Sequence, residues 1–215
     1  HSNGTPTWSP DNRRVVFTSN RGGAFNLWEL EIESSQLTQV TSGPGMDLNP
    51  VTSVAGGLAY MQFNHQIDLY TLELGAPEQR LTAHKRDNFQ ARFSPDGKKI
   101  VYYSNRTGNH EIWLIDRETG AERRLTNHLA EDFGPDWSPE GREIVFLSNR
   151  GGQFDLWVMN AEGGELRVIM GQNVLVPGIS PVTMAPRWSP DGTTIGYVAP
   201  SEHGIALWTV TPQGE

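Results

Sequence analysis

The feature that most constrains the fold of this chain is a short motif that recurs along its whole length. An aromatic residue is followed by Ser-Pro and then by an acidic residue, and Gly usually comes next. Pro presets φ near the value for the second position of a type I turn, and Gly supplies the positive φ that follows. Each copy therefore predicts a tight hairpin between two strands. The copies are Trp8-Ser9-Pro10-Asp11, Phe93-Ser94-Pro95-Asp96-Gly97, Trp137-Ser138-Pro139-Glu140-Gly141 and Trp188-Ser189-Pro190-Asp191-Gly192.

The spacing of these motifs indicates a fifth, degenerate copy. The distance from Trp8 to Phe93 is twice a period of about 43 residues, and a segment at residues 51–57 occupies the midpoint. This segment lacks the aromatic residue and Pro but keeps Gly, and Leu58-Ala59-Tyr60 follows it as a β-rich run. The sequence therefore contains five copies of one unit.

The rest of each unit repeats as well. The second strand carries Val16-Phe17, Ala59-Tyr60, Val101-Tyr102, Val145-Phe146 and Gly196-Tyr197. The third carries Leu27-Trp28, Leu69-Tyr70, Ile112-Trp113, Leu156-Trp157 and Leu207-Trp208, and a fourth segment ends at Val40-Thr41, Leu81-Thr82, Leu125-Thr126 and Val168-Ile169. Four short strands at this period are typical of a β-propeller blade, and such sheets must pack face to face to bury both surfaces.

We therefore predict an all-β chain that forms a single five-bladed β-propeller over residues 1–215. The expected blades are approximately 1–42, 43–83, 84–127, 128–170 and 182–215, with an insertion at 171–181. The fifth copy stops after its third strand, so we expect its blade to lack the outer strand. An unpaired edge at Ala206–Val210 would follow, and natural sheets usually cover such an edge.

All seven tryptophans fall at two repeat positions. Aromatic side chains contribute much of the buried area in tightly packed cores. This placement favours core packing between blades over a role as stacking platforms for a sugar ligand.

A polar column precedes the first strand of each unit: Asn3, Asp47, Asn88, Asp132 and Thr183. The first strand is the innermost in a propeller, so we expect these oxygen-bearing side chains to surround one mouth of the central channel. They can bind a partner or polar ligand there, or hold a hard cation such as calcium. The alternative is that they cap the turns that lead into the strands.

A second column, of mixed charge, lies just before the aromatic residue of the first strand. It reads Thr7, Val51, Arg92, Asp136 and Arg187, and we interpret it as a polar wall of the channel.

Composition excludes several classes of function. The net charge of −8 disfavours a generic nucleic-acid surface, and the absence of cysteine excludes a disulfide scaffold and thiol chemistry. No apolar run is long enough for a membrane span, and no signal peptide is visible. The sequence has no nucleophile elbow, Walker loop or metal-spaced cluster of histidine, so we expect no catalytic residues and no cofactor.

The repeated Trp-Ser-Pro-Asp-Gly, Ile-Val-Phe, Ser-Asn-Arg, Leu-Trp and Arg-Leu-Thr resemble the repeat of TolB-type β-propellers, also called the Pro-Asp or WD40-like repeat. The resemblance covers essentially the whole chain. The founding member of that family is a periplasmic component of the Tol–Pal envelope system. It has an α/β domain before a six-bladed propeller that binds a peptidoglycan-associated lipoprotein. In this sequence we count five copies and expect no such domain before them.

The resemblance implies a non-enzymatic binding or scaffolding propeller with a protein partner and a periplasmic or extracellular location. Similar repeats also occur in the lid domains of prolyl-oligopeptidase-like peptidases and in oligogalacturonate lyases. The alternative is therefore that this chain is the lid or substrate-binding propeller of an enzyme. A hydrolase domain in the reading frame beyond residue 215 would favour the enzyme.

Overall fold

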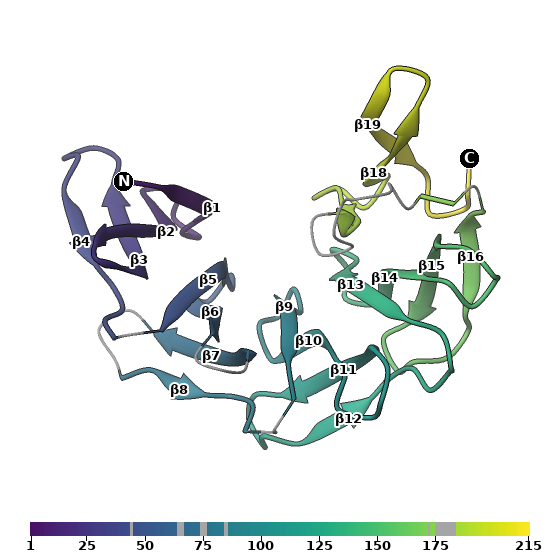
Figure 1. Ribbon diagram of the computed structural model, residues 1–215, viewed down its shortest axis with the longest axis horizontal. Coiled ribbons are helices and arrows are strands. Elements are labelled where there is room, and N and C mark those ends of the chain that lie inside the picture. Colours follow the sequence, from purple (N-terminus) through teal and green to yellow (C-terminus); the bar gives the residue numbers. More distant parts are fainter. Residues whose placement is uncertain (44, 64–66, 74–76, 84–85, 172, 175–183) are drawn as a thin grey trace.

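In the computed structural model, the chain folds into five antiparallel sheets that follow one another in sequence (Figure 1). The structure describes residues 1–215 except 44, 64–66, 74–76, 84–85, 172 and 175–183. The first sheet contains β1 (Asn3–Trp8), β2 (Arg14–Gly22), β3 (Ala24–Glu31) and β4 (Leu37–Gln39), and the second β5 (Met46–Thr52), β6 (Gly57–Phe63), β7 (Ile67–Glu73) and β8 (Gln79–Arg80). The third contains β9 (Asn88–Phe93), β10 (Lys99–Ser104), β11 (Glu111–Asp116) and β12 (Glu122–Arg124), and the fourth β13 (Asp132–Trp137), β14 (Glu143–Ser148), β15 (Asp155–Asn160) and β16 (Arg167–Met170). The fifth contains β17 (Arg187–Trp188), β18 (Ile195–Ser201) and β19 (Gly204–Val210).

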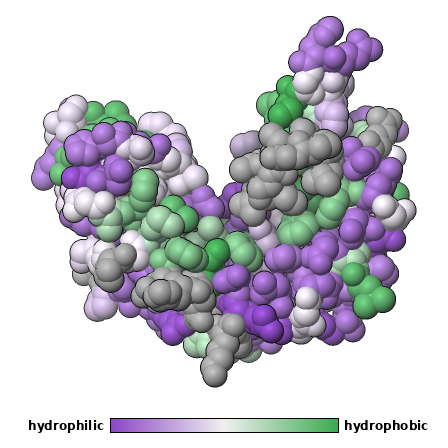
Figure 2. All heavy atoms as spheres, viewed as in Figure 1, coloured by the Kyte–Doolittle hydropathy of each residue, from purple (hydrophilic) through white to green (hydrophobic). Residues whose placement is uncertain are grey.

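The five blades form an arc that stays open between the first and the fifth sheet (Figure 1). The opening is also visible when all atoms are drawn (Figure 2). The first strand of each sheet lies on the inner side of the arc, and the fourth strands of the first four sheets lie on its outer rim (Figure 1). The five-bladed propeller expected from the repeats is confirmed, but these residues form an open arc rather than a closed ring.

The fifth sheet has three strands among the described residues, in the order β17-β18-β19. This confirms the expectation that the last blade lacks its outer strand. After β19 the chain turns toward the fourth sheet, where Arg167 Nη2 donates a hydrogen bond to the carbonyl oxygen of Pro212 at 3.3 Å. The chain end therefore lies against the outer strand of blade four.

The core lies between neighbouring sheets. Residues 144–147 of β14 are buried on both faces of the strand, as the nearly continuous apolar run predicts for a covered sheet. Val145 and Leu147 of β14 belong to the cluster that contains Tyr197 of the fifth sheet. Ile144 and Phe146 of the same strand belong to the cluster shared with the third sheet. Alternate residues of one strand thus serve two different interfaces.

The prediction that all seven tryptophans are core was wrong for two of them. Trp137 is 6% exposed, whereas Trp8 is 54% and Trp208 is 45% exposed. Among the described residues, no blade lies before that of Trp8 to cover it, and Trp208 lies in the sheet that has three strands. In the first, third and fourth blades, an arginine of the second hairpin covers the tryptophan of the third strand, as Arg106 does over Trp113.

The Ser-Pro-Asp turns are held by one repeated set of hydrogen bonds. Ser94 Oγ donates to Asp96 at 2.6 Å and accepts the amide of Lys99 at 2.9 Å, while the amide of Lys98 donates to Asp96 at 3.0 Å. Gly97 follows with a φ of 69°, the left-handed conformation that the motif predicts.

We expect these turns to make stability depend on pH in the acid range. The Ser189 hydroxyl and the Thr193 amide lower the pKa of Asp191 from 3.8 to about 2. A carboxyl group whose pKa is lower in the folded state stabilises the fold above its unfolded pKa, and this stabilisation is lost as pH falls through the folded pKa. Titration of Asp191 by carbon NMR should give a midpoint near 2, and a midpoint near 3.8 would contradict this account.

Candidate binding surface on the inner face of the arc

The polar column at the start of the inner strands connects neighbouring blades. Thr41, at the end of blade one, donates its hydroxyl to Asp47 of β5, and Gln62 Nε2 donates to the same carboxylate at 3.0 Å. In the next blade, Asn88 Nδ2 donates to Thr82 Oγ1 at 3.2 Å. The threonine that closes one blade is thus bonded to the first polar residue of the following blade.

Two other members of the column are held by the arginine of their own blade. Arg150 Nη2 donates to Asp132 at 2.8 Å, and Arg21 Nη2 donates to Asn3 at 3.0 Å. These arginines also lie over the aromatic rings of their sheets, so one side chain shields an aromatic residue and fixes the strand start.

The structure corrects the expected placement of this column. Asp47, Asn88 and Asp132 are buried rather than open to the channel, because the hydrogen bonds described above hold them inside the blades. Asn3 is exposed, and Thr183 lies outside the described residues, as does most of the 171–181 insertion. A binding role for the column stays a prediction. Within the described part of the chain, no group of three or more His, Asp or Glu side chains is placed to hold a metal ion.

A β-bulge in the inner strands explains why the side-chain directions differ from simple alternation. The residue two positions after the polar column has a positive φ in four blades, and the register with the second strand shifts there. These residues are Thr5, Asn49, Gln90 and Gly134, with φ values of 42°, 51°, 47° and 60°. The bulge reorients the residues that follow it along the inner strand.

Half-buried apolar side chains follow the polar column by one residue: Leu48, Phe89 and Phe133. Phe89 stacks on Tyr103 with ring centroids 5.0 Å apart, and Phe133 lies 4.8 Å from the His110 ring. Figure 2 shows hydrophobic side chains gathered on the inner side of the arc. This set was not predicted from the sequence, although an apolar residue directly after each of these polar positions is a signal for it.

Three members of the mixed-charge column, Arg92, Asp136 and Arg187, form a cluster across three consecutive blades. Arg92 Nε lies 3.6 Å from Asp136 Oδ1, and the other carboxylate oxygen of Asp136 accepts the amide of Trp188 at 2.9 Å. Arg187 adds a second guanidinium near the same carboxylate. The cluster therefore places two cations around one anion.

Burial dominates the electrostatics of this cluster. It raises the pKa of Asp136, and the charges of Arg187 and Arg92 oppose that rise. Burial and the like charge of Arg187 lower the pKa of Arg92 to about 10, and burial also lowers the pKa of Arg187. Arginine is not deprotonated in proteins at neutral pH, so two guanidinium groups surround one carboxyl group in a partly desolvated place.

Comparison with known proteins supports the fold. The sequence profile of the TolB beta propeller domain, PD40, matches residues 48–182. The chain is 28% identical over 118 residues to the protein TolB homolog of Chlorobium luteolum, which covers 54% of this chain and 27% of that protein. It is 26% identical over 114 residues to the Tol-Pal system protein TolB of Francisella tularensis subsp. tularensis, covering 51% and 26%. The matched region is thus about a quarter of the length of either relative.

Solved structures share the architecture at low sequence identity. TolB from Acinetobacter baumannii superimposes with a TM-score of 0.79 at 19% identity, over 99% of this chain and 52% of that one. An oligogalacturonate lyase in complex with manganese gives a TM-score of 0.75 at 15% identity, over 97% and 62%. At these identities the likeness concerns the fold alone. Among the described residues, we find no helix with the length and apolar character needed to cross a membrane.

Proposed function

The chain belongs to the PD40 family of TolB β-propeller domains, and from this premise we propose that it is a non-enzymatic module that binds a protein partner along the inner face of its arc. The contact surface combines the apolar residues Leu48, Phe89 and Phe133 with the charged cluster of Arg92, Asp136 and Arg187. Asn3 is the exposed member of the polar column, whose buried members position the strands.

The observation that carries this proposal is the charged cluster. Three consecutive blades each contribute one charged residue at the same position of their inner strand, and two of these strands, β9 and β13, also carry Phe89 and Phe133. An apolar area with a few convergent polar groups is typical of binding sites. Because guanidinium groups recognise carboxylates with specific geometry, the partner is expected to present an acidic side chain to Arg92 and Arg187.

Replacing both arginines should weaken binding. We expect Arg92→Gln/Arg187→Gln to lower partner affinity at least about tenfold, because a charge-assisted hydrogen bond contributes more than a neutral one. The matched control is Arg13→Gln/Lys98→Gln, which makes the same change in charge at exposed positions. Surface plasmon resonance with the captured partner measures both variants, and equal affinity in the two would contradict the proposal.

Photo-crosslinking identifies that partner. A benzophenone amino acid replaces the exposed Met46 at the start of β5, and a second variant carries it at Leu166 beside the outer strand β16. Both are incubated with an envelope extract of a bacterium that contains the Tol–Pal system, and products are identified by mass spectrometry. We expect one protein to be crosslinked from position 46 and not from 166. Equal products from both positions would count against an inner-face site.

We further propose a periplasmic location and a role in a Tol-Pal system, by analogy with the relative named as a Tol-Pal system protein. The enzyme alternative is supported only by fold likeness, because part of a lyase structure and part of a puromycin-hydrolyzing peptidase structure superimpose on this chain at low sequence identity. The described inner face offers charged and apolar groups for binding, and we assign no catalytic role to any of them.

A further inference from the structure

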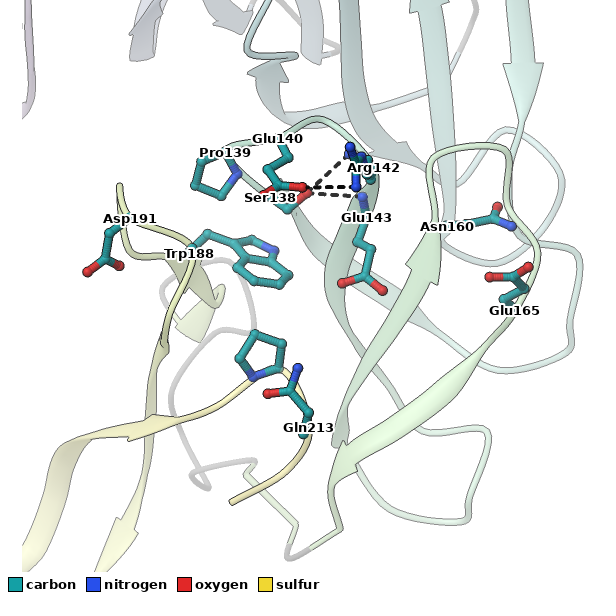
Figure 3. A pocket seen from close by; sticks show the side chains of 12 residues that line it. Ser138, Pro139, Glu140, Arg142, Glu143, Asn160, Glu165, Trp188, Asp191 and Gln213 are labelled. Carbon is teal, nitrogen blue, oxygen red and sulfur yellow. Dashed lines mark hydrogen bonds and ion pairs between the residues drawn. The ribbon is translucent and has the colours of Figure 1, made fainter.

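A cavity opens at the interface between blades four and five, on the side of the Ser-Pro turns (Figure 3). Its volume is about 520 Å³, which falls in the range of small-ligand sites. The corresponding place between blades three and four holds a cavity of only about 180 Å³. Since both are built on the same repeat positions, the difference reflects the residues that line them.

The tryptophan of the inner strand is held differently in the two interfaces. Trp137 Nε1 donates to the carbonyl oxygen of Arg92 at 3.3 Å, and this indole is almost fully buried. Trp188 occupies the same repeat position in blade five, where its indole lies across the cavity (Figure 3). Its Nε1 finds no acceptor among the described residues. The Trp188 ring is therefore one wall of the cavity, and no hydrogen bond fixes it.

The lining of the larger cavity is acidic. Glu140, Glu143, Glu165 and Asp191 contribute carboxylates, and Arg142 is the one basic residue of the described lining. Glu143 occupies the repeat position that Lys99 holds in the smaller cavity, since both follow the Ser-Pro turn and donate their amide to its serine. This repeat position is therefore basic at the interface between blades three and four and acidic at the interface between blades four and five.

Part of this negative charge is not neutralised within the protein. Glu143 pairs with Arg167 at 2.8 Å, and Glu140 makes an exposed pair with Arg142 at 3.4 Å. The Glu165 carboxylate has no hydrogen-bond or ion-pair partner in the described part of the chain. The Asp191 carboxyl, with its lowered pKa, is ionised at neutral pH.

We propose that this cavity is a second binding site for a peptide, and that it takes a basic side chain of that peptide, the alkylammonium group of lysine or the guanidinium group of arginine. The Trp188 ring provides an aromatic face for the cation, and Glu140 and Glu165 provide the opposing charge. The site is separate from the inner face of the arc and does not depend on it.

The test is an NMR titration of the Trp188 indole N–H signal, assigned by its loss in Trp188→Phe. The probes are acetyl-Gly-Lys-Gly-amide and acetyl-Gly-Arg-Gly-amide, with acetyl-Gly-Glu-Gly-amide and spermidine as comparison ligands. We expect a saturable shift with the basic peptides and weaker binding of the acidic peptide and of spermidine. A shift that does not saturate, or an acidic peptide that binds equally, would overturn the proposal. Spermidine binding as tightly as the peptides would overturn the assignment to a peptide.

Two charge variants locate the effect in the cavity. Glu140→Gln/Glu165→Gln should weaken peptide binding at least about threefold, because two partly exposed carboxylates are lost. Glu33→Gln/Glu202→Gln removes the same charge at exposed positions outside the cavity and should bind like the original protein. If both variants lose affinity equally, the peptide senses only the net charge of the protein and the proposed site is wrong.

Discussion

Leu156→Ala is expected to lower the free energy of unfolding by about 2–5 kcal/mol, the usual cost of truncating a fully buried leucine. Leu156 lies on β15, is 0% exposed, and packs against the fifth sheet. The same position of the fifth sheet holds Leu207, which is 76% exposed. Leu207→Ala should therefore change stability by no more than about 0.5 kcal/mol.

This pair of variants tests the packing of the arc because residue type and repeat position are the same. Guanidinium chloride unfolding, followed by circular dichroism, gives both values under identical conditions. If Leu207→Ala costs as much as Leu156→Ala, the outer face of blade five is covered in solution, and the open arc does not describe the protein there.

Gly163→Ala is expected to be destabilising by about 2–5 kcal/mol. Gly163 lies in the turn between β15 and β16 with a φ of +88°, where an L-residue is strained by about 1–2 kcal/mol. A Cβ at this position would also lie 2.6 Å from the carbonyl oxygen of Leu125 in the neighbouring blade, so the backbone of one blade must move. The turn therefore requires glycine for its conformation and for close approach.

Gly152→Ala separates these two effects. Gly152 has a φ of +97° in the turn before β15, and no heavy atom lies within 4 Å of a Cβ built there. Its replacement should cost only the backbone strain, about 1–2 kcal/mol. The difference between the two losses in free energy of unfolding, obtained from thermal melting, then measures the cost of the steric contact between blades. Equal losses would show that the backbone near Leu125 accommodates the added methyl group without cost.

The architecture was predictable because the signals for it are local and repeated. The Ser94-Pro95-Asp96-Gly97 turn has the expected hydrogen bonds and the expected positive φ at Gly97. The missing outer strand of the fifth sheet also followed from the position of Leu207-Trp208 within the repeat. Turn chemistry and periodicity depend on neighbouring residues, so one sequence is sufficient to read them.

The directions of the polar side chains were not predictable in the same way. Asp132 was expected at the channel mouth, yet Arg150 holds it inside the blade. Gly134 adopts a positive φ two residues later and shifts the strand register, so counting alternate residues assigns the wrong face. The size of a cavity between two blades, such as the one lined by Trp188, likewise depends on tertiary packing, which no local sequence pattern contains.

The open arc has a consequence for how cooperativity is distributed in these residues. A blade inside the array is stabilised by two neighbours, whereas the first and fifth sheets of the described chain each adjoin one, and the energy of such an array is close to a sum of nearest-neighbour terms. Local opening therefore costs least at its two extremities and most near β9–β14. The charged cluster of Arg92 and Asp136 belongs to the central, most resistant blades, and Arg187 connects it to a terminal one.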